Sequence, residues 1–492
     1  MTSKIATLSE IENVLCNNDK TDEGVLHFIS AFRIRRFIGI FDEIKRKGIS
    51  VSMVLFSLII FRLRGNSIPR NLNHPINFLP KIDDNTFYRL MNNPWMNWRK
   101  LLIGFARQFV KHVEEKGDNN TGITCFVVDD TDLEKSGKTI EYIGRIFNHV
   151  TKRNILGFKM LLLSYWDSKS LIPVDFSLHR EKGKKGSYGL TAKERKAQFR
   201  KRRDPKSPGY KRVEELDVKK HENAMSMIRR AVKTGLKASY VLMDSWFVND
   251  SVIKGIRAIK KGAMHVLGMC KIDKRNYLIN KKQMNAHQLI TRYERTKSKY
   301  SRKYKSRYIS LVADYKGTTV RLFFIQYNHS KNWSLVLTTD LTLSFVQAIE
   351  IYQIRWSIEV LNKECKQYLR LGCSQNTDFD GQIADTTLTL ITHMVLTLQK
   401  RFGSYETMGE LFRETQQYLL ELTLWERLLR VFYKMILQLF EIIDVDLEEV
   451  IGTLLKGDEA SRKLRLMLSA ICDIQENDCF LNKNDIELPL AS

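Results

Sequence analysis

Tyr352, Arg355, Glu359 and Lys366 stand at offsets of three, seven and fourteen residues from the first of them. On a helix that turns about 100° per residue, all four fall within an arc of roughly 60°. An apolar stripe falls on the neighbouring arc and would face the core. A helical face of this kind is usually a solvated ladder of salt bridges, and Arg355 and Lys363 do flank Glu359 at four-residue steps. Whether this face does chemistry therefore depends on residues elsewhere in the chain.

Two more carboxylates follow apolar runs that are typical of buried strands. The segment FVVDDTDLEKSG contains Asp129, and YVLMDSWFVND contains Asp244. The carboxyl end of a buried strand opens into the crevice where α/β sheets bind ligands, although an Asp there can also cap the helix or turn that follows. With Glu359, the two aspartates would form a set of three oxygen ligands, which suits Mg²⁺ or Mn²⁺. Two such ions can drive the in-line cleavage of a phosphodiester bond.

These aspartates give the charged helix a second interpretation. Glu359 would be the third metal ligand. Tyr352, Arg355 and Lys366 would hold the phosphates of the DNA strand that is cut. The first ligand is either Asp129 or Asp130, because alternate positions of a strand face opposite sides of the sheet.

The segment YQIRWSIEVLNKECK resembles the Y-x2-R-x3-E-x6-K signature of one class of bacterial insertion-sequence DDE transposases. These enzymes have an RNase H-like fold and fall in the retroviral-integrase superfamily. All four signature residues are present at the family's spacings, and so is the RW-x-IE form that is common in the class. The family's D-x-T element matches Asp129 and Thr131, which favours Asp129 over Asp130, and its second aspartate matches Asp244.

The resemblance implies a transposase that binds the terminal inverted repeats of its element, cuts the phosphodiester bonds at the ends and joins the 3′-hydroxyls to target DNA. Asp129, Asp244 and Glu359 would hold two Mg²⁺ (or Mn²⁺) ions in each active site. Double-stranded DNA would be the partner, within a synaptic complex built on a homodimer. The signature residues expected to contact the DNA backbone are Tyr352, Arg355 and Lys366.

Two other functions fit parts of the same pattern. One is a non-catalytic DNA-binding regulator or decayed element, which would use the basic surface alone. The other is an RNase H-like structure-specific nuclease that cuts DNA without strand transfer. The three intact acids argue against decay, and only the detection of joined products separates the nuclease from the transposase.

The charge of the chain indicates a polyanionic partner. Lys and Arg number 80 against 55 Asp and Glu, which gives a net charge of +25 over 492 residues. So large an excess favours nucleic acid over an anionic membrane surface. The apolar run from Ile49 to Phe61 is shorter than the ~20 residues that span a bilayer, and no signal peptide is evident. Seven scattered cysteines without zinc spacing predict a reduced protein of the bacterial cytoplasm, associated with the nucleoid when bound to DNA.

A densely basic segment from Arg180 to Arg212 offers a second surface for DNA. It is either a solvated loop or a track for phosphates, which would add affinity that depends on salt rather than on base sequence. Trp246, two residues after Asp244, could stack on a displaced base or pack under the sheet. The basic residues expected at DNA are Lys184, Lys185, Arg200, Lys201, Arg202 and Arg203.

The elements that must position these residues alternate between helices and strands. Apolar runs predict strands at Ile123–Val128, Lys159–Tyr165, Leu171–Leu178, Ser239–Met243 and Ala263–Cys270, and helices are expected at Glu214–Thr234 and Asp250–Lys261. Three strands followed by alternating helix and strand indicate a mixed α/β sheet. The predicted fold class is an RNase H-like α/β core with a mostly β insertion, flanked by N- and C-terminal helical regions.

The predicted organisation follows from these elements. Helical patterns at Val25–Phe41, Ser50–Leu63 and Trp98–Glu115 precede the core, and the stripe from Leu424 to Ile443 follows it as either domain core or a dimer interface. The expected regions are a helical DNA-end-binding region at 1–120, the first part of the core at 121–270, a mostly β insertion at 271–342, core helices with the signature at 343–400, and a C-terminal helical region at 401–492 that could dimerise.

Overall fold

The computed structural model describes residues 32, 49–72, 83–118, 122–183, 186–327, 330, 332–417 and 419. Two compact units divide the chain, and the larger one comprises Val25–Phe37 and Tyr88–Leu411. The described helices of the smaller unit are α4 (Val51–Leu63), α5 (Ile68–Leu72) and the start of α6 (Asp84–Met91). The expected helices at Val25–Phe41 and Leu424–Ile443 lie outside the described residues, apart from Phe32.

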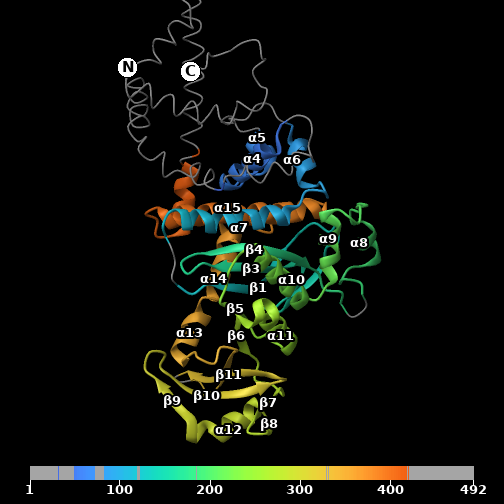
Figure 1. Ribbon diagram of the computed structural model, residues 1–492. Helices are drawn as coiled ribbons and strands as arrows, with labels where there is room; N and C mark the ends of the chain where they lie inside the picture. The colour runs from blue at the N-terminus through green and yellow to red at the C-terminus, as the bar shows by residue number, and fades with distance from the viewer. Residues whose placement is uncertain are drawn as a thin grey trace, which may run out of the picture. The chain divides into compact units, whose positions relative to one another are not determined.

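The larger unit is built on a mixed sheet. Its first half pairs in the order β4-β3-β1-β5-β6, in which β1, β3 and β4 are antiparallel and β1, β5 and β6 are parallel. This arrangement confirms the predicted mixed α/β fold and is consistent with an RNase H-like core (Figure 1). The bounds are β1 Cys125–Glu134, β3 Arg153–Trp166, β4 Leu171–His179, β5 Tyr240–Met243 and β6 His265–Cys270.

The parallel pairing of β1 with β5 sets the register of the two aspartates. Val128 lies opposite Met243, so Asp129 lies in register with Asp244. Asp244 directly follows β5, whereas β1 continues through Asp129 to Glu134, six residues beyond the predicted end at Val128. The residues before the two aspartates are fully buried on both strands, as expected for central strands covered on both faces. Burial of these apolar runs therefore fixes where the two carboxylates emerge.

Helices cover both faces of this half of the sheet (Figure 1). The helices α7 (Trp98–Glu115) and α15 (Phe379–Phe402) pack on each other and on β4, and α10 (Lys220–Lys233) packs on β3 and β4. The side chain of Asn97 caps α7 by accepting a hydrogen bond from the Lys100 amide, and the apolar face of the helix is buried. The helix α11 (Asp250–Ala258) connects β5 to β6.

The sheet continues into a second, antiparallel half that the chain inserts between β6 and α13. Its longest pair is the hairpin of β10 and β11, whose turn residues Lys316 and Gly317 both have positive φ, at 52° and 84°. Two consecutive residues with positive φ form a type I′ turn, whose twist matches that of the flanking strands. A helix that the sequence pattern did not predict, α12, packs on this hairpin. The bounds are β7 Asn276–Ile279, β8 Lys282–Asn285, α12 Ala286–Lys297, β9 Ser298–Ser301, β10 Ser306–Tyr315, β11 Thr318–Tyr327 and β12 Ser334–Thr338.

Several elements differ from the expected boundaries. The structure adds the short strand β2 (Gly144–Asn148) beside β3, and it divides the expected helix at Glu214–Thr234 into separate segments. Those segments are α9 (Pro208–Glu214), the 3₁₀ turn Glu215–Asp217 and α10; the basic segment also contains α8 (Ala192–Lys196), and a second 3₁₀ turn (Ile259–Gly262) follows α11. Among the described helices, none combines the length and apolar character needed to cross a membrane.

The signature segment forms two helices rather than the predicted single one. These are α13 (Phe345–Gln353) and α14 (Trp356–Gln367). Between them, the Arg355 amide donates to the Tyr352 carbonyl at 3.0 Å, and the Ser357 amide donates to the Ile354 carbonyl at 3.0 Å. The backbone hydrogen bonds therefore span three residues here, as in a 3₁₀ helix, instead of the four of an α-helix. Glu359 and Lys366 share one side of α14, whereas Tyr352 belongs to α13. The spacing of residues alone does not distinguish the two hydrogen-bond patterns.

Candidate active site

The carboxylates of Asp129 and Glu359 are brought together by one guanidinium. Arg355 donates from Nη1 to Asp129 Oδ2 at 3.2 Å and from Nη2 to Glu359 Oε1 at 2.6 Å. Asp129 comes from β1, whereas Arg355 and Glu359 lie at the start of α14, which packs on β1. The side chains of Asp129 and Arg355 are each 15% exposed and that of Glu359 is 37% exposed, so the two ion pairs are partly shielded from water.

The faces of β1 separate the neighbouring aspartates. Thr131, which shares the face of Asp129 by strand alternation, accepts a 2.6 Å hydrogen bond from Lys366 Nζ of α14. Asp130 pairs instead with Lys220 of α10, and Asp132 pairs with Lys159 of β3 at 3.1 Å. Asp129 is therefore the member of the acidic run that faces Glu359.

Burial and nearby like charges raise the pKa values of Asp129 and Asp244. Burial raises the pKa of Asp129 to about 7, and the charges of Asp244 and Asp130 add to the increase, although the Asp130 amide and Arg355 act against it. Burial also raises the pKa of Asp244, with a further contribution from Asp130. Two buried carboxylates that repel each other form a site that a cation would stabilise.

Tyr352 lies at the end of α13, close to the same groups. The centre of its ring lies 5.8 Å from the Arg355 guanidinium carbon, and the nearby charge of Asp244 helps to raise the pKa of its hydroxyl. Burial is the main cause that raises the pKa of the phenol to about 12, so the hydroxyl stays protonated near neutral pH and can donate a hydrogen bond.

A solvent-open cavity of about 490 Å³ lies beside these groups. Acids and cations both line it, and Asp244, Arg355 and Tyr352 are not among its walls. The lining residues are Asp129, Asp130, Thr131, Glu359, Asn362, Lys363, Lys366 and Gln367.

The donor chemistry fits a hard divalent cation. Asp129, Asp244 and Glu359 supply only carboxylate oxygens, the ligands that Mg²⁺ and Mn²⁺ prefer, and the first two are raised in pKa by burial and by other acids nearby. Within the described ranges, no three His, Cys, Asp or Glu side chains are already placed to hold one ion together. Arg355 is instead the cation that joins Asp129 to Glu359.

Trp246 is exposed beside the second aspartate. Its side chain is 53% exposed, its amide donates to Asp244 Oδ1 at 3.0 Å, and Lys220 Nζ lies 5.2 Å from its ring centroid. The adjacent Phe247 is buried and packs against it edge-on. The structure thus places one aromatic ring at the surface near the site and the other in the core.

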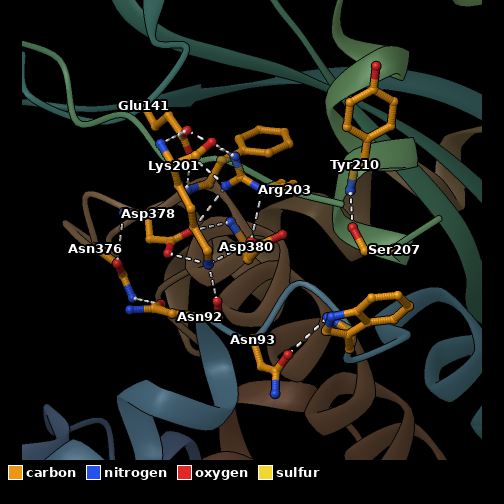
Figure 2. Close-up of polar contacts among 12 residues, drawn as sticks. Asn92, Asn93, Glu141, Lys201, Arg203, Ser207, Tyr210, Asn376, Asp378 and Asp380 are labelled. Atoms are coloured by element: carbon orange, nitrogen blue, oxygen red, sulfur yellow. Dashed lines mark hydrogen bonds and ion pairs between the residues drawn. The ribbon is translucent and has the colours of Figure 1, made fainter. Parts of the chain in front are cut away.

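The basic segment divides into inward and outward residues. Residues 199–204 have no regular hydrogen bonding, and alternate side chains point to opposite sides: Arg200 and Arg202 are exposed, whereas Arg203 is buried. Lys201 and Arg203 point into an acidic cluster formed by Glu141, Asp378 and Asp380, as Figure 2 shows. Lys184 and Lys185 lie outside the described residues.

The contacts of this cluster account for both inward cations. Arg203 donates to both oxygens of Glu141 at 2.9 and 2.5 Å, to Asp380 at 3.0 Å and to Asp378 at 3.2 Å. Lys201 Nζ donates to Asp378 at 2.8 Å and to Asp380 at 3.0 Å. Lys201 and Arg203 were expected to bind phosphate. In the structure, carboxylates of the protein itself already pair with both cations.

Two groups of residues near the site were not anticipated from sequence. Lys220, which pairs with Asp130 and lies under Trp246, sits at the start of a helix 90 residues further along the chain. The acids of the cluster in Figure 2 come from the β1–β2 connection and the start of α15. No local spacing signals either contact, because both join segments that are distant in sequence.

The larger unit is thus a mixed α/β domain in which carboxylates and phosphate-compatible donors meet between β1 and α14. Two family models match the chain: DDE superfamily endonuclease over residues 81–261 and transposase DDE domain over residues 213–395. The first match contains Asp129 and Asp244, and the second contains Asp244 and Glu359. A search of curated proteins found no match.

These matches support a transposase or endonuclease of the DDE superfamily. Domains of this superfamily generally use divalent metal ions such as Mg²⁺, and a transposase domain implies a DNA substrate.

Proposed function

We propose that this protein is an insertion-sequence transposase of the class with the Y-x2-R-x3-E-x6-K signature. It binds the terminal inverted repeats of its element, cleaves the phosphodiester bonds at the ends and transfers the 3′-hydroxyl ends to target DNA. The observation that carries the proposal is the meeting of three sequence-distant groups: Asp129 and Asp244 share a register on adjacent parallel strands, and Arg355 joins Asp129 to Glu359.

In this proposal, Asp129, Asp244 and Glu359 hold two divalent ions. When bound, the ions lower the pKa of the attacking water or hydroxyl and stabilise the leaving oxygen. Arg355 and Lys366 bind the phosphates of the cleaved strand, Arg355 through its planar fork of donors and Lys366 as a point charge. The protonated Tyr352 donates a hydrogen bond to a phosphate near the cut, and Trp246 stacks on a base there.

The remaining regions take supporting roles. Residues 1–120 bind the element ends, residues 121–270 and 343–400 form the catalytic core around the insertion at 271–342, and residues 401–492 contribute to a homodimer. The reaction takes place in the bacterial cytoplasm at the nucleoid.

Metal-dependent cutting tests the proposal directly. With Mg²⁺, the wild-type protein should nick a duplex that carries the inverted repeats flanking its reading frame, and EDTA should stop the reaction. Asp244→Ala and Glu359→Gln should abolish nicking while the affinity for the duplex, measured by fluorescence anisotropy, stays within about threefold, because the phosphate contacts remain.

Three outcomes separate the candidate functions. Joined products with a supercoiled target support the transposase. Nicking without joined products under the same conditions indicates a nuclease, an option that the endonuclease family match also favours. Duplex binding without any nicking points to a regulator and contradicts the proposal.

Arg200 and Arg202 should track the DNA backbone. The slope of log affinity against log salt is negative, and replacing both residues with Gln should make it less steep by about 1.8, because each lost phosphate contact removes about 0.9. Non-specific duplex binding, measured by anisotropy across a salt series, checks this expectation.

A matched control comes from α10, which starts beside Asp130 and runs toward the amino end of β5. Arg229 and Lys233 are exposed on that helix, and Lys233 lies about 20 Å along its axis from Lys220. Arg229→Gln with Lys233→Gln removes the same charge and should leave the slope nearly unchanged. Equal slopes for the two double variants would show that residues 200 and 202 have no special role.

A further inference from the structure

Arg355 occupies the carboxylate oxygens that the proposed metal site needs. Its two Nη atoms bond to Asp129 and Glu359, one to each, and the shorter contact is 2.6 Å. A guanidinium is a flat, singly charged group that bridges two carboxylates at hydrogen-bond distance. Mg²⁺ or Mn²⁺ needs oxygens at about 2.1 Å, so an ion that bridges the same two acids requires them to be closer together than the guanidinium allows.

The helix junction explains why Arg355 reaches both acids. The three-residue hydrogen bonds between α13 and α14 place Arg355 directly before the first turn of α14, one turn from Glu359. From there its side chain extends to β1. The acids on the other face of β1 already have cations of their own, since Lys220 pairs with Asp130 and Lys159 with Asp132. Among the described residues, the ion pairs of Asp129 and Glu359 are both made with Arg355.

We propose that Arg355 competes with the active-site ion for Asp129 and Glu359, and that its release on ion binding makes the guanidinium available to a DNA phosphate. This inference rests on the proposed function, since it assumes that the two acids are metal ligands. It assigns Arg355 two successive partners. The guanidinium first neutralises the acids, and it then binds phosphate once a stronger cation has replaced it.

The same residue could instead be a fixed strut that holds the acids in place for the ion. The two roles predict opposite effects of removing the guanidinium. A competitor lowers ion affinity, so its loss should tighten binding. A strut preorganises the ligands, so its loss should weaken binding.

Mn²⁺ binding to the full-length protein, measured by isothermal titration calorimetry without DNA, distinguishes these roles. Arg355→Gln should tighten Mn²⁺ binding by about fivefold or more, within the usual range of coupling between two ligands. Arg355→Lys should also tighten it, because the lysine side chain is shorter and lacks the planar two-nitrogen fork that spans the gap between these two carboxylates. Arg355→Lys keeps the positive charge, so it still tests the inference if Arg355→Gln fails to fold.

Lys366→Gln is the matched control. Lys366 lines the same cavity and carries the same charge, but its ammonium contacts the Thr131 hydroxyl rather than a carboxylate. Its removal should change Mn²⁺ affinity by less than about twofold. Equal tightening in Lys366→Gln and Arg355→Gln would overturn the inference in favour of general repulsion, and unchanged or weaker binding in both Arg355 variants would overturn it in favour of the strut.

Two further variants separate a failure of this inference from a failure of the proposed function. Asp129→Asn and Glu359→Gln should each abolish the saturable Mn²⁺ site of the wild-type protein. If neither does, the metal site itself is wrong, and the inference falls with the proposed function. If both do while Arg355→Gln and Arg355→Lys fail to tighten binding, only the inference is overturned.

Discussion

Asp129→Asn should reduce cleavage and strand transfer by about 1000-fold or more, which corresponds to about 4 kcal/mol of lost stabilisation in the transition state. The substitution removes a carboxylate that directly follows the buried apolar half of β1 and lies in register with Asp244, the residue after β5. It keeps the size and the hydrogen-bonding ability of the side chain, so the fold should persist. Single-turnover cleavage of an inverted-repeat duplex, with binding measured in parallel, checks the effect.

Asp130→Asn is the matched comparison for this prediction. Asp130 has the same charge one residue later, but it pairs with Lys220 on the opposite side of the strand. We expect its loss to slow cleavage by about 10- to 100-fold, as is typical of a residue that acts through its neighbours, and so by clearly less than the loss of Asp129. If Asp130→Asn abolished cleavage and Asp129→Asn did not, the first metal ligand would be Asp130.

Arg203→Gln should destabilise the larger unit by about 3–5 kcal/mol, the effect expected when one partner of a buried ion cluster is removed. The side chain of Arg203 is 2% exposed, and those of Glu141, Asp378 and Asp380 are 2%, 6% and 3% exposed. Without the guanidinium, three buried acids would share the single charge of Lys201. Denaturant unfolding followed by circular dichroism measures the change.

Two variants test the cause of that loss. Arg202→Gln removes the same charge from the adjacent exposed position and should change stability by less than about 0.5 kcal/mol. Burial raises the pKa of Asp380, so this carboxylate already resists ionisation, although Arg203 and Lys201 act against that increase. Asp380→Asn should therefore restore part of the stability of Arg203→Gln. Additive losses in the double variant would show that the two side chains do not interact.

Local patterns predicted much of the fold because they reflect local physics. The period of apolar residues gave α7 its observed bounds, Trp98–Glu115, and the apolar run before Asp244 gave β5 to within one residue. Patterns of this kind missed β2 and α12. The strand β2 is only five residues long, and both elements pack on neighbours that local sequence does not reveal, β2 on β3 and α12 on β10.

The signature segment shows where periodicity reaches its limit. Its buried stripe holds through α14, where Ile358, Leu361 and Cys365 are all buried. The step to three-residue hydrogen bonds at Arg355 is invisible in the spacing, yet it moves Tyr352 onto a separate helix. A small change of backbone hydrogen bonding thus divided the polar residues between two helices.

The sequence by itself determined the charge of the chain, the apolar runs that precede Asp129 and Asp244, and the spacing of the residues from Tyr352 to Lys366. Only the tertiary structure decided which partner each charge has. It turned Asp129 toward Arg355 and Asp130 toward Lys220, and it directed Lys201 and Arg203 into a buried acidic cluster. The physical reason is that strand and helix preferences act over a few residues, whereas charges are paired by segments that meet only after the sheet has formed.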